Sequence, residues 1–167
     1  MKVVRILITI FLVSILASCN NRGEPEVLEK LEYYALRRGE ESGEWIRDEE
    51  PLFTGNDILD YEWESHTITF TDAFLAKMPI VEDNDYEVLN GSKILRLYYP
   101  DRFSVYLKNE EIYMGDVEPQ AFISFYPGGP IIKNSDNGIM IDCMNDELDT
   151  RYDEGLSAFL EQVGLLK

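Results

Sequence analysis

The sequence predicts an α+β domain in which an antiparallel β-sheet carries a short helix and a C-terminal helix packed on one face. Two observations support this fold class. Apolar and polar residues alternate with period two in several segments, as in strands with one buried face. The last segment, "DTRYDEGLSAFLEQVGLLK", instead places its apolar residues at helical spacing. A series of strands followed by a terminal helix favours an antiparallel sheet over alternating β-α units.

The strands are expected at short, evenly distributed segments. Thr54 is expected to cap a short turn before the segments "YEW" and "HTITF", which predict a hairpin. Thr71 or Asp72 is expected to cap a short helix that ends at Met78, before a proline. The predicted strands are residues 32–37, 61–63, 66–70, 94–98, 103–107, 131–133 and 138–144.

The clearest hairpin is "FSVYLKNEEIYMG", with its turn expected at residues 108–110. The terminal helix is expected to begin after a cap at Asp149 or Thr150 and to stop at Gly164. Its buried face is predicted to consist of Tyr152, Leu156, Phe159, Leu160 and Val163.

Two further expectations concern single segments. The stretch "RRGEESGEWIRDEEP" is charged and contains glycine, which predicts an exposed loop in which Trp45 and Ile46 cover part of the core. Cys143 lies in the alternating segment "GIMIDCM", which predicts a buried strand position for its side chain.

The chain begins with its one long apolar run, residues 6–17, preceded by Lys2 and Arg5. As a helix this run would rise about 18 Å, which is too short for a hydrocarbon core of about 30 Å. A positive start, a short apolar run and small residues after it are the features of a cleaved secretory signal peptide. The sequence therefore predicts a signal peptide over residues 1–18.

The segment Leu16-Ala17-Ser18-Cys19 resembles the bacterial lipobox. The resemblance implies that Cys19 becomes the mature N-terminus and is acylated, for example by palmitate. The expected organisation is a signal peptide (1–18), a lipidated cysteine with a polar tether (19–30) and a single α+β domain (31–167). The expected partner of Cys19 is the lipid bilayer, and the expected location is the cell membrane or outer membrane with the domain outside the cytoplasm.

The mature chain would be strongly acidic. Removal of residues 1–18 deletes Lys2 and Arg5 and no acidic residue, so the formal charge changes from −17 to −19 over the remaining 149 residues. A chain of this charge is repelled by nucleic acid, and no basic patch is present to bind it. With Cys19 acylated, Cys143 is the only thiol, which excludes an intramolecular disulfide.

A resemblance to a known domain covers residues 52–166. The order "PLFTGNDI", "FTDAFLAKM", "FSVYLKNEEIYMGDV", "GGPI" and a final helix ending "GLL" is similar to the periplasmic head domain of the translocase subunit SecD. The resemblance implies that fold, with an Asn109-Glu110 turn where SecD has Asp-Gly. It implies no translocase activity, because these segments supply none of SecD's transmembrane helices. The segments "YEWESHTI" and "EEIYMG" also resemble a family of small uncharacterised bacterial lipoproteins.

No residue pattern points to a specific catalytic site. His66 is the only histidine, so it is either a general base or a hairpin residue whose ring covers a neighbouring strand, and the second interpretation is favoured because no glycine elbow surrounds Ser65. The acidic stretches "EDNDYE" and "NSDNG" offer oxygen atoms but lack the spacing of a calcium loop. We therefore expect no catalytic residue, no bound metal and no cofactor.

Aromatic residues are the better candidates for a contact surface, since Tyr and Trp are enriched at interfaces. The candidate binding face consists of Trp45, Tyr61, Trp63, His66 and Tyr113. The favoured hypothesis is a non-enzymatic lipoprotein that binds or supports another envelope protein. The alternative is a metal-assisted hydrolase that uses the acidic loops.

Overall fold

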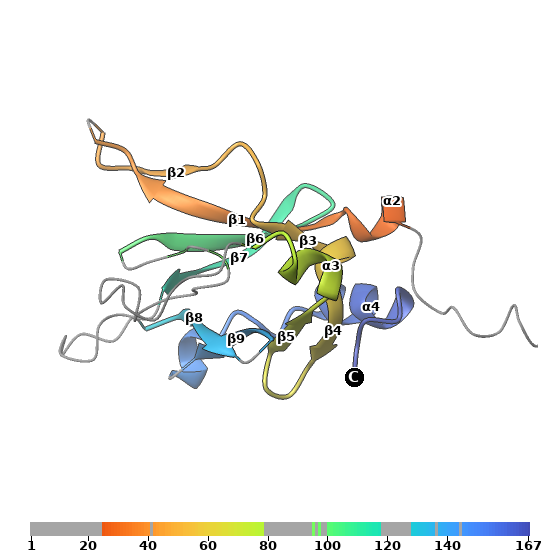
Figure 1. Ribbon diagram of the computed structural model, residues 1–167. Coiled ribbons are helices and arrows are strands. Elements are labelled where there is room, and N and C mark those ends of the chain that lie inside the picture. Colours follow the sequence, from red (N-terminus) through yellow and green to blue (C-terminus); the bar gives the residue numbers. More distant parts are fainter. Residues whose placement is uncertain are drawn as a thin grey trace, which may run out of the picture.

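The computed structural model describes residues 25–40, 42–78, 95, 97, 100–117, 128–135, 137–143 and 145–167. It shows a predominantly β domain with short helices (Figure 1). The strands are β1 (Leu31–Arg38), β2 (Trp45–Arg47), β3 (Phe53–Thr54), β4 (Ile58–Glu62), β5 (Thr67–Phe70), β6 (Arg102–Leu107), β7 (Glu110–Val117), β8 (Pro130–Ser135) and β9 (Gly138–Cys143). The helices are α2 (Pro25–Leu28), α3 (Asp72–Leu75) and α4 (Glu154–Gln162), with 3-10 turns η2 (Gly55–Asp57) and η4 (Asp146–Leu148).

All nine strands belong to one mainly antiparallel sheet. Their order is β2-β1-β6-β7-β8-β9-β5-β4, and β3 pairs with β1 beside β2. Among the described strands, β7 and β8 form a parallel pair. The fold class predicted from the sequence is thus confirmed, and the terminal helix contributes buried residues to the core.

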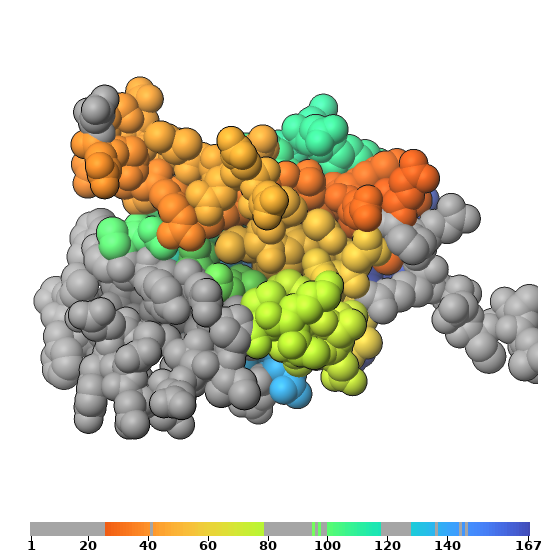
Figure 2. Space-filling model, turned by 45° about the horizontal axis from the view of Figure 1, so that its top comes forward, coloured from red at the N-terminus to blue at the C-terminus, as the bar shows by residue number. Residues whose placement is uncertain are grey.

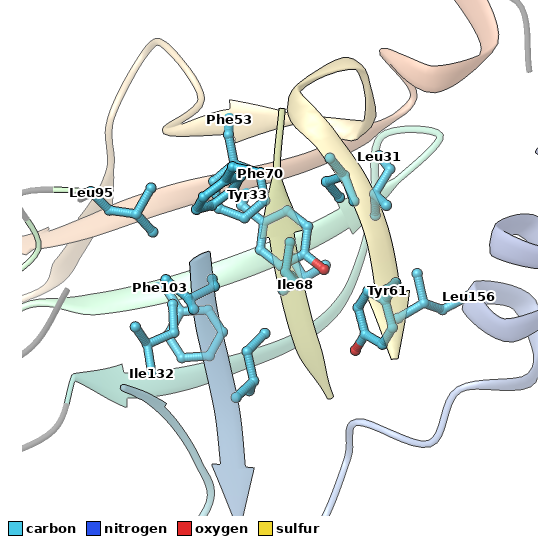
Figure 3. Packing of buried hydrophobic residues seen from close by; sticks show 14 of the residues in the cluster. Leu31, Tyr33, Phe53, Tyr61, Ile68, Phe70, Leu95, Phe103, Ile132 and Leu156 are labelled. Carbon is cyan, nitrogen blue, oxygen red and sulfur yellow. The ribbon is translucent and has the colours of Figure 1, made fainter. Parts of the chain in front are cut away.

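The sheet bends so that β1 and β3 face β5 across the core (Figure 3). Phe53 of β3, which is paired with β1, stacks on Tyr33 of β1 with ring centroids 4.2 Å apart. The same Phe53 ring meets Phe70 of β5 edge-on at 4.8 Å, although β5 lies near the other end of the strand order. One interior is therefore enclosed between the two halves of a single sheet. Figure 2 shows α3 lying against the segment that carries β3 and η2.

The hairpin between β6 and β7 turns at Lys108-Asn109, as predicted. Both turn residues have positive φ, 54° and 68°, which is the backbone of a type I′ turn. The Lys108 N–H donates to the carbonyl of Lys30 at 2.8 Å, so the hairpin tip rests on the chain that leaves α2.

A better turn sequence should stabilise this hairpin. Left-handed backbone costs a non-glycine residue about 1 kcal/mol, and Asn followed by Gly is the preferred pair for a type I′ turn. The double variant Lys108→Asn, Asn109→Gly is therefore expected to raise the free energy of unfolding by about 1 kcal/mol, measured by urea titration. The Lys108 and Lys30 backbone contact is kept in this variant, so a loss of stability would contradict the assigned turn.

Two predicted local structures around β4 and β5 are confirmed. The Thr54 hydroxyl accepts the Asn56 N–H, and the Asp57 carboxylate accepts the Thr54 N–H at 2.9 Å, which makes a reciprocal cap of η2. β4 and β5 form the expected antiparallel hairpin. Thr71 caps α3, but the helix ends at Leu75, so the expected extension to residue 78 is wrong.

The terminal helix begins later than expected. Asp153, not Asp149 or Thr150, is the N-cap, and its carboxylate accepts the Leu156 N–H at 2.7 Å. Tyr152 therefore precedes the helix and is 55% exposed, whereas the other four residues of the predicted face are buried: Leu156, Phe159, Leu160 and Val163. The helix stops as predicted at Gly164, with φ of 71°. Two hydrogen bonds close its end, from Gly164 N–H to Glu161 O and from Leu165 N–H to Leu160 O.

Two single-segment expectations are corrected. Residues 45–47 are not part of a loop but form β2, which pairs with the end of β1. Trp45 and Ile46 cover no core, because they are 39% and 55% exposed. Cys143 ends β9 and is half-buried rather than buried, with its thiol donating to the Asn145 carbonyl at 3.4 Å. Of the predicted strand at residues 94–98, only Leu95 and Leu97 are described, and both are buried.

Candidate functional site

His66 closes the turn between β4 and β5 and is held in an unusual backbone conformation. Its φ is +49°, a left-handed value that is uncommon for a residue with a side chain. Its carbonyl accepts the Ile141 N–H from β9 at 3.0 Å. This conformation directs the ring inward, and the side chain is 0% exposed.

The His66 ring has one polar contact and three aromatic contacts. A 2.7 Å hydrogen bond joins its Nδ1 to the hydroxyl of Tyr61. Tyr61 is a core residue of β4 and is labelled in Figure 3. Its centroid lies 5.1 Å from that of Trp63 and 4.7 Å from that of Tyr152. Within the described part of the chain, its Nε2 has no hydrogen-bond partner. The imidazole thus lies between the core and two aromatic rings near the surface.

The pKa of His66 is lowered to about 4, mainly by burial and to a smaller extent by the positive charge of Arg151. Arg151 is itself buried and donates to the Ile141 carbonyl and, through Nε at 2.8 Å, to the Asp149 carboxylate. The hydrogen bonds that Arg151 donates to Asp149 lower the pKa of the Asp149 carboxyl. At neutral pH the imidazole is therefore uncharged beside a fixed ion pair.

This arrangement does not prepare His66 for general-base catalysis. The neighbouring Ser65 hydroxyl is hydrogen-bonded to Glu62 Oε2 and Thr67 Oγ1, both at 2.8 Å, rather than to the imidazole. A general base must reach its substrate's proton within hydrogen-bond distance. A fully buried ring that is bonded to a core tyrosine does not meet this requirement. The structure places His66 in the packing role that the sequence favoured.

The five residues of the predicted binding face do not share a surface. Tyr61, His66 and Tyr113 are buried, and Trp63 is half-buried over His66. Trp45 lies in β2, at the other end of the strand order from β4. Alternation with period two shows that a strand has two faces but not which one is covered. Aromatic residues on the inner face were therefore indistinguishable from exposed ones in the sequence.

A cleft of about 370 Å³ lies outside the His66 ring, between the β4–β5 turn and α4. It is lined by the rings of Trp63 and Tyr152 and by Glu154, Ser157 and Glu161 of α4. The sequence analysis missed this cleft because it assigned Tyr152 to the buried face of the helix. The available signal was the pair Glu154 and Glu161, two turns apart on the polar face of α4.

A second hollow of about 470 Å³ runs along β7 to the start of β8. Met114 and Leu148, both substantially exposed, contribute apolar atoms, and Arg102 and Asp116 contribute an ion pair at 2.7 Å. Gly128 and Gly129 lie at one end of this hollow. These residues provide no group that is poised for chemistry.

Among the described residues, no three His, Cys, Asp or Glu side chains are grouped so as to hold a metal ion. The acidic stretch at residues 82–87 and Asp136 lie outside the described residues, as does Cys19. Asn134 and Asn137 flank the turn between β8 and β9. The described residues contain no helix long and apolar enough to cross a bilayer.

Comparisons with known proteins provide no family. The chain matches no protein-family model, no curated protein and no solved structure. The resemblances to the SecD head domain and to small bacterial lipoproteins therefore stay predictions.

Proposed function

We propose that this protein is a lipoprotein, anchored by acylation of Cys19, whose domain serves as a non-enzymatic binding module outside the cytoplasm. The observation that carries the proposal is the segment Leu16-Ala17-Ser18-Cys19 directly after a charged start and a short apolar run. A lipobox at this place requires both features, and the chain has them in the expected order.

The physical basis of the anchor is burial of methylene groups in the bilayer. Each buried methylene contributes about 0.8 kcal/mol, and two acyl chains are enough for stable attachment. The tether of residues 19–30 overlaps α2, which begins at Pro25, so only a few residues separate Cys19 from the folded domain. The domain would thus work close to the membrane surface.

The non-enzymatic part of the proposal is supported by the state of the only histidine. His66 is buried and its pKa is lowered to about 4, so it offers neither an accessible base nor a charged acid at neutral pH. The exposed cleft at α4 contains carboxylates and aromatic rings but no histidine or cysteine. Its groups are suited to binding.

Replacement of the lipobox cysteine tests the anchor. Cys19→Ala is expected to abolish fatty-acid incorporation and to leave an unprocessed precursor, because the acylated thiol is missing. The measurement is metabolic labelling with an alkyne-bearing palmitate, followed by membrane fractionation. Cys143→Ala is the matched control, since it removes the only other thiol of the chain and should keep the label. Normal labelling of the Cys19→Ala variant would refute the lipoprotein proposal.

A further inference from the structure

The cleft beside α4 has two aromatic walls. The rings of Trp63 and Tyr152 lie 5.8 Å apart between centroids and are nearly perpendicular, at 78°. Tyr152 remains 55% exposed although it contacts both Trp63 and His66. The faces of aromatic rings carry partial negative charge and attract cations within about 6 Å. The two rings contact each other edge-on, and the part of the Tyr152 ring that stays exposed beside Trp63 is where an organic cation can approach.

The cleft is also lined by acidic residues of α4. Glu154 and Glu161 lie on the same face of α4, seven residues and therefore about 10 Å apart along the helix axis. Asp153 also lines the cleft, but its carboxylate caps the helix through the Leu156 N–H. No Lys or Arg is among the described residues that line the cleft. The nearby cation Arg151 pairs with Asp149, and its guanidinium lies over the Tyr152 ring at 5.6 Å from the centroid, so an incoming cation would contact the other face of that ring.

We propose that this cleft binds a basic polypeptide segment of a partner protein, with one lysine or arginine side chain against the exposed part of the Tyr152 ring and a second basic residue at Glu161. The proposal names the partner class of the binding module described above and rests on that role. Charge complementarity supports a polypeptide, because the formal charge of −17, or −19 without residues 1–18, attracts basic partners over long range. Glu154 and Glu161 are also about 10 Å apart along the helix axis, which is farther than a single cationic group extends.

A bare metal ion fits these groups less well. Among the described residues no three His, Cys, Asp or Glu side chains are grouped to hold a metal ion, and the backbones of Glu154 and Glu161 are about 10 Å apart along the helix axis. Aromatic faces add nothing to the coordination of a hard cation, whereas they contact the aliphatic stem and the charged head of lysine or arginine. The combination of aromatic rings and separated carboxylates therefore favours a ligand with two organic cations, one at the ring and one at a glutamate.

Trp63 provides the signal for a binding experiment. The chain has only two tryptophans, and Trp45 lies at the distant end of the strand order. The full chain carrying Trp45→Phe, in a non-ionic detergent, is titrated with an acetylated tetralysine amide while Trp63 fluorescence is recorded. We expect saturable binding that weakens as salt is raised from about 0.05 to 0.3 M, because exposed charges are screened. A tetraglutamine amide of the same length is expected not to bind.

Variants of the cleft test the geometry. Tyr152→Ala is expected to weaken tetralysine binding about three- to fivefold, whereas Tyr152→Phe should stay within about twofold, because the ring is kept and only the hydroxyl is lost. The double variant E154Q, E161Q should lose most of the salt dependence. Thermal melting checks that each variant remains folded, which is expected because these side chains are exposed or line the surface.

Three outcomes would overturn the inference: an unchanged affinity in Tyr152→Ala, equal binding of tetraglutamine, or tetramethylammonium binding as tightly as tetralysine. The last result would identify a site for small cations and exclude the polypeptide. None of these results affects the labelling of Cys19, so failure of this inference is distinguishable from failure of the anchor.

Discussion

Replacement of Phe159 by alanine is expected to lower the free energy of unfolding by about 3–5 kcal/mol. Phe159 lies in the middle of α4, is 3% exposed and belongs to the single hydrophobic core. Its removal takes away the transfer free energy of a benzyl group and leaves a cavity that the surrounding strands cannot fill. The measurement is equilibrium urea denaturation followed by far-UV circular dichroism.

A milder variant keeps this prediction testable, because the loss could approach the whole stability of a small domain, about 5–15 kcal/mol. Phe159→Leu preserves most of the apolar volume and should lose less than half as much. Gln162→Ala is the control on the same helix, since Gln162 is exposed and the change should stay within about 0.5 kcal/mol. A loss below about 1 kcal/mol for Phe159→Ala would mean that α4 contributes little to the core.

The strands and turns that depend on local sequence were predictable. The hairpin at Lys108-Asn109 and the Thr54 cap arise from residues that are adjacent in the chain, and the structure contains both. The stop at Gly164 has the same basis, since glycine adopts positive φ without a steric penalty. Such features need no knowledge of the partners across the core.

Features that depend on distant contacts were not predictable. β2 is a strand only because residues 45–47 pair with the end of β1, and its composition is that of an exposed loop. The start of α4 was misplaced because Asp149 and Asp153 are equally good caps in the sequence. The Asp149 carboxylate instead accepts a hydrogen bond from Arg151, which also donates to the Ile141 carbonyl of β9.

In the candidate site, too, local features were predictable and contacts between distant segments were not. The sequence identified Trp63 and His66 as neighbours in one turn, but not that Tyr152 would meet them from a segment more than 80 residues later. It favoured a packed His66 but could not show the positive φ of that residue or the hydrogen bond of its ring to Tyr61. The cleft therefore became visible only in three dimensions.

Removal of His66 should flatten the pH dependence of stability between about pH 4 and pH 6.5. In the unfolded chain the imidazole has its ordinary pKa of about 6.5. In the folded protein burial and Arg151 lower this pKa to about 4. Between these values the unfolded state binds one proton more than the folded state, so the stability rises with pH across this window.

The size of the effect follows from the difference between the two pKa values. Each pKa unit corresponds to about 1.4 kcal/mol, so His66 alone should make the protein about 3 kcal/mol less stable at pH 4 than at pH 7. The lowered pKa values of Asp142 and Asp149 act below this window, because their stabilisation is present above the ordinary carboxyl pKa and is lost as the pH falls further.

The measurement compares urea denaturation of the parent chain, His66→Gln and Glu64→Gln at half-unit steps from pH 4 to pH 7.5. His66→Gln should be less stable at pH 7, since a buried hydrogen bond to Tyr61 is disturbed, yet it should lose much less stability on acidification. Glu64→Gln changes an exposed side chain of the same turn and should keep the slope of the parent. If stability changed equally with pH in the parent and in His66→Gln, the difference in bound protons between the folded and unfolded states would arise from another residue. The imidazole would then be accessible to solvent, and the argument against His66 as a base would fail with it.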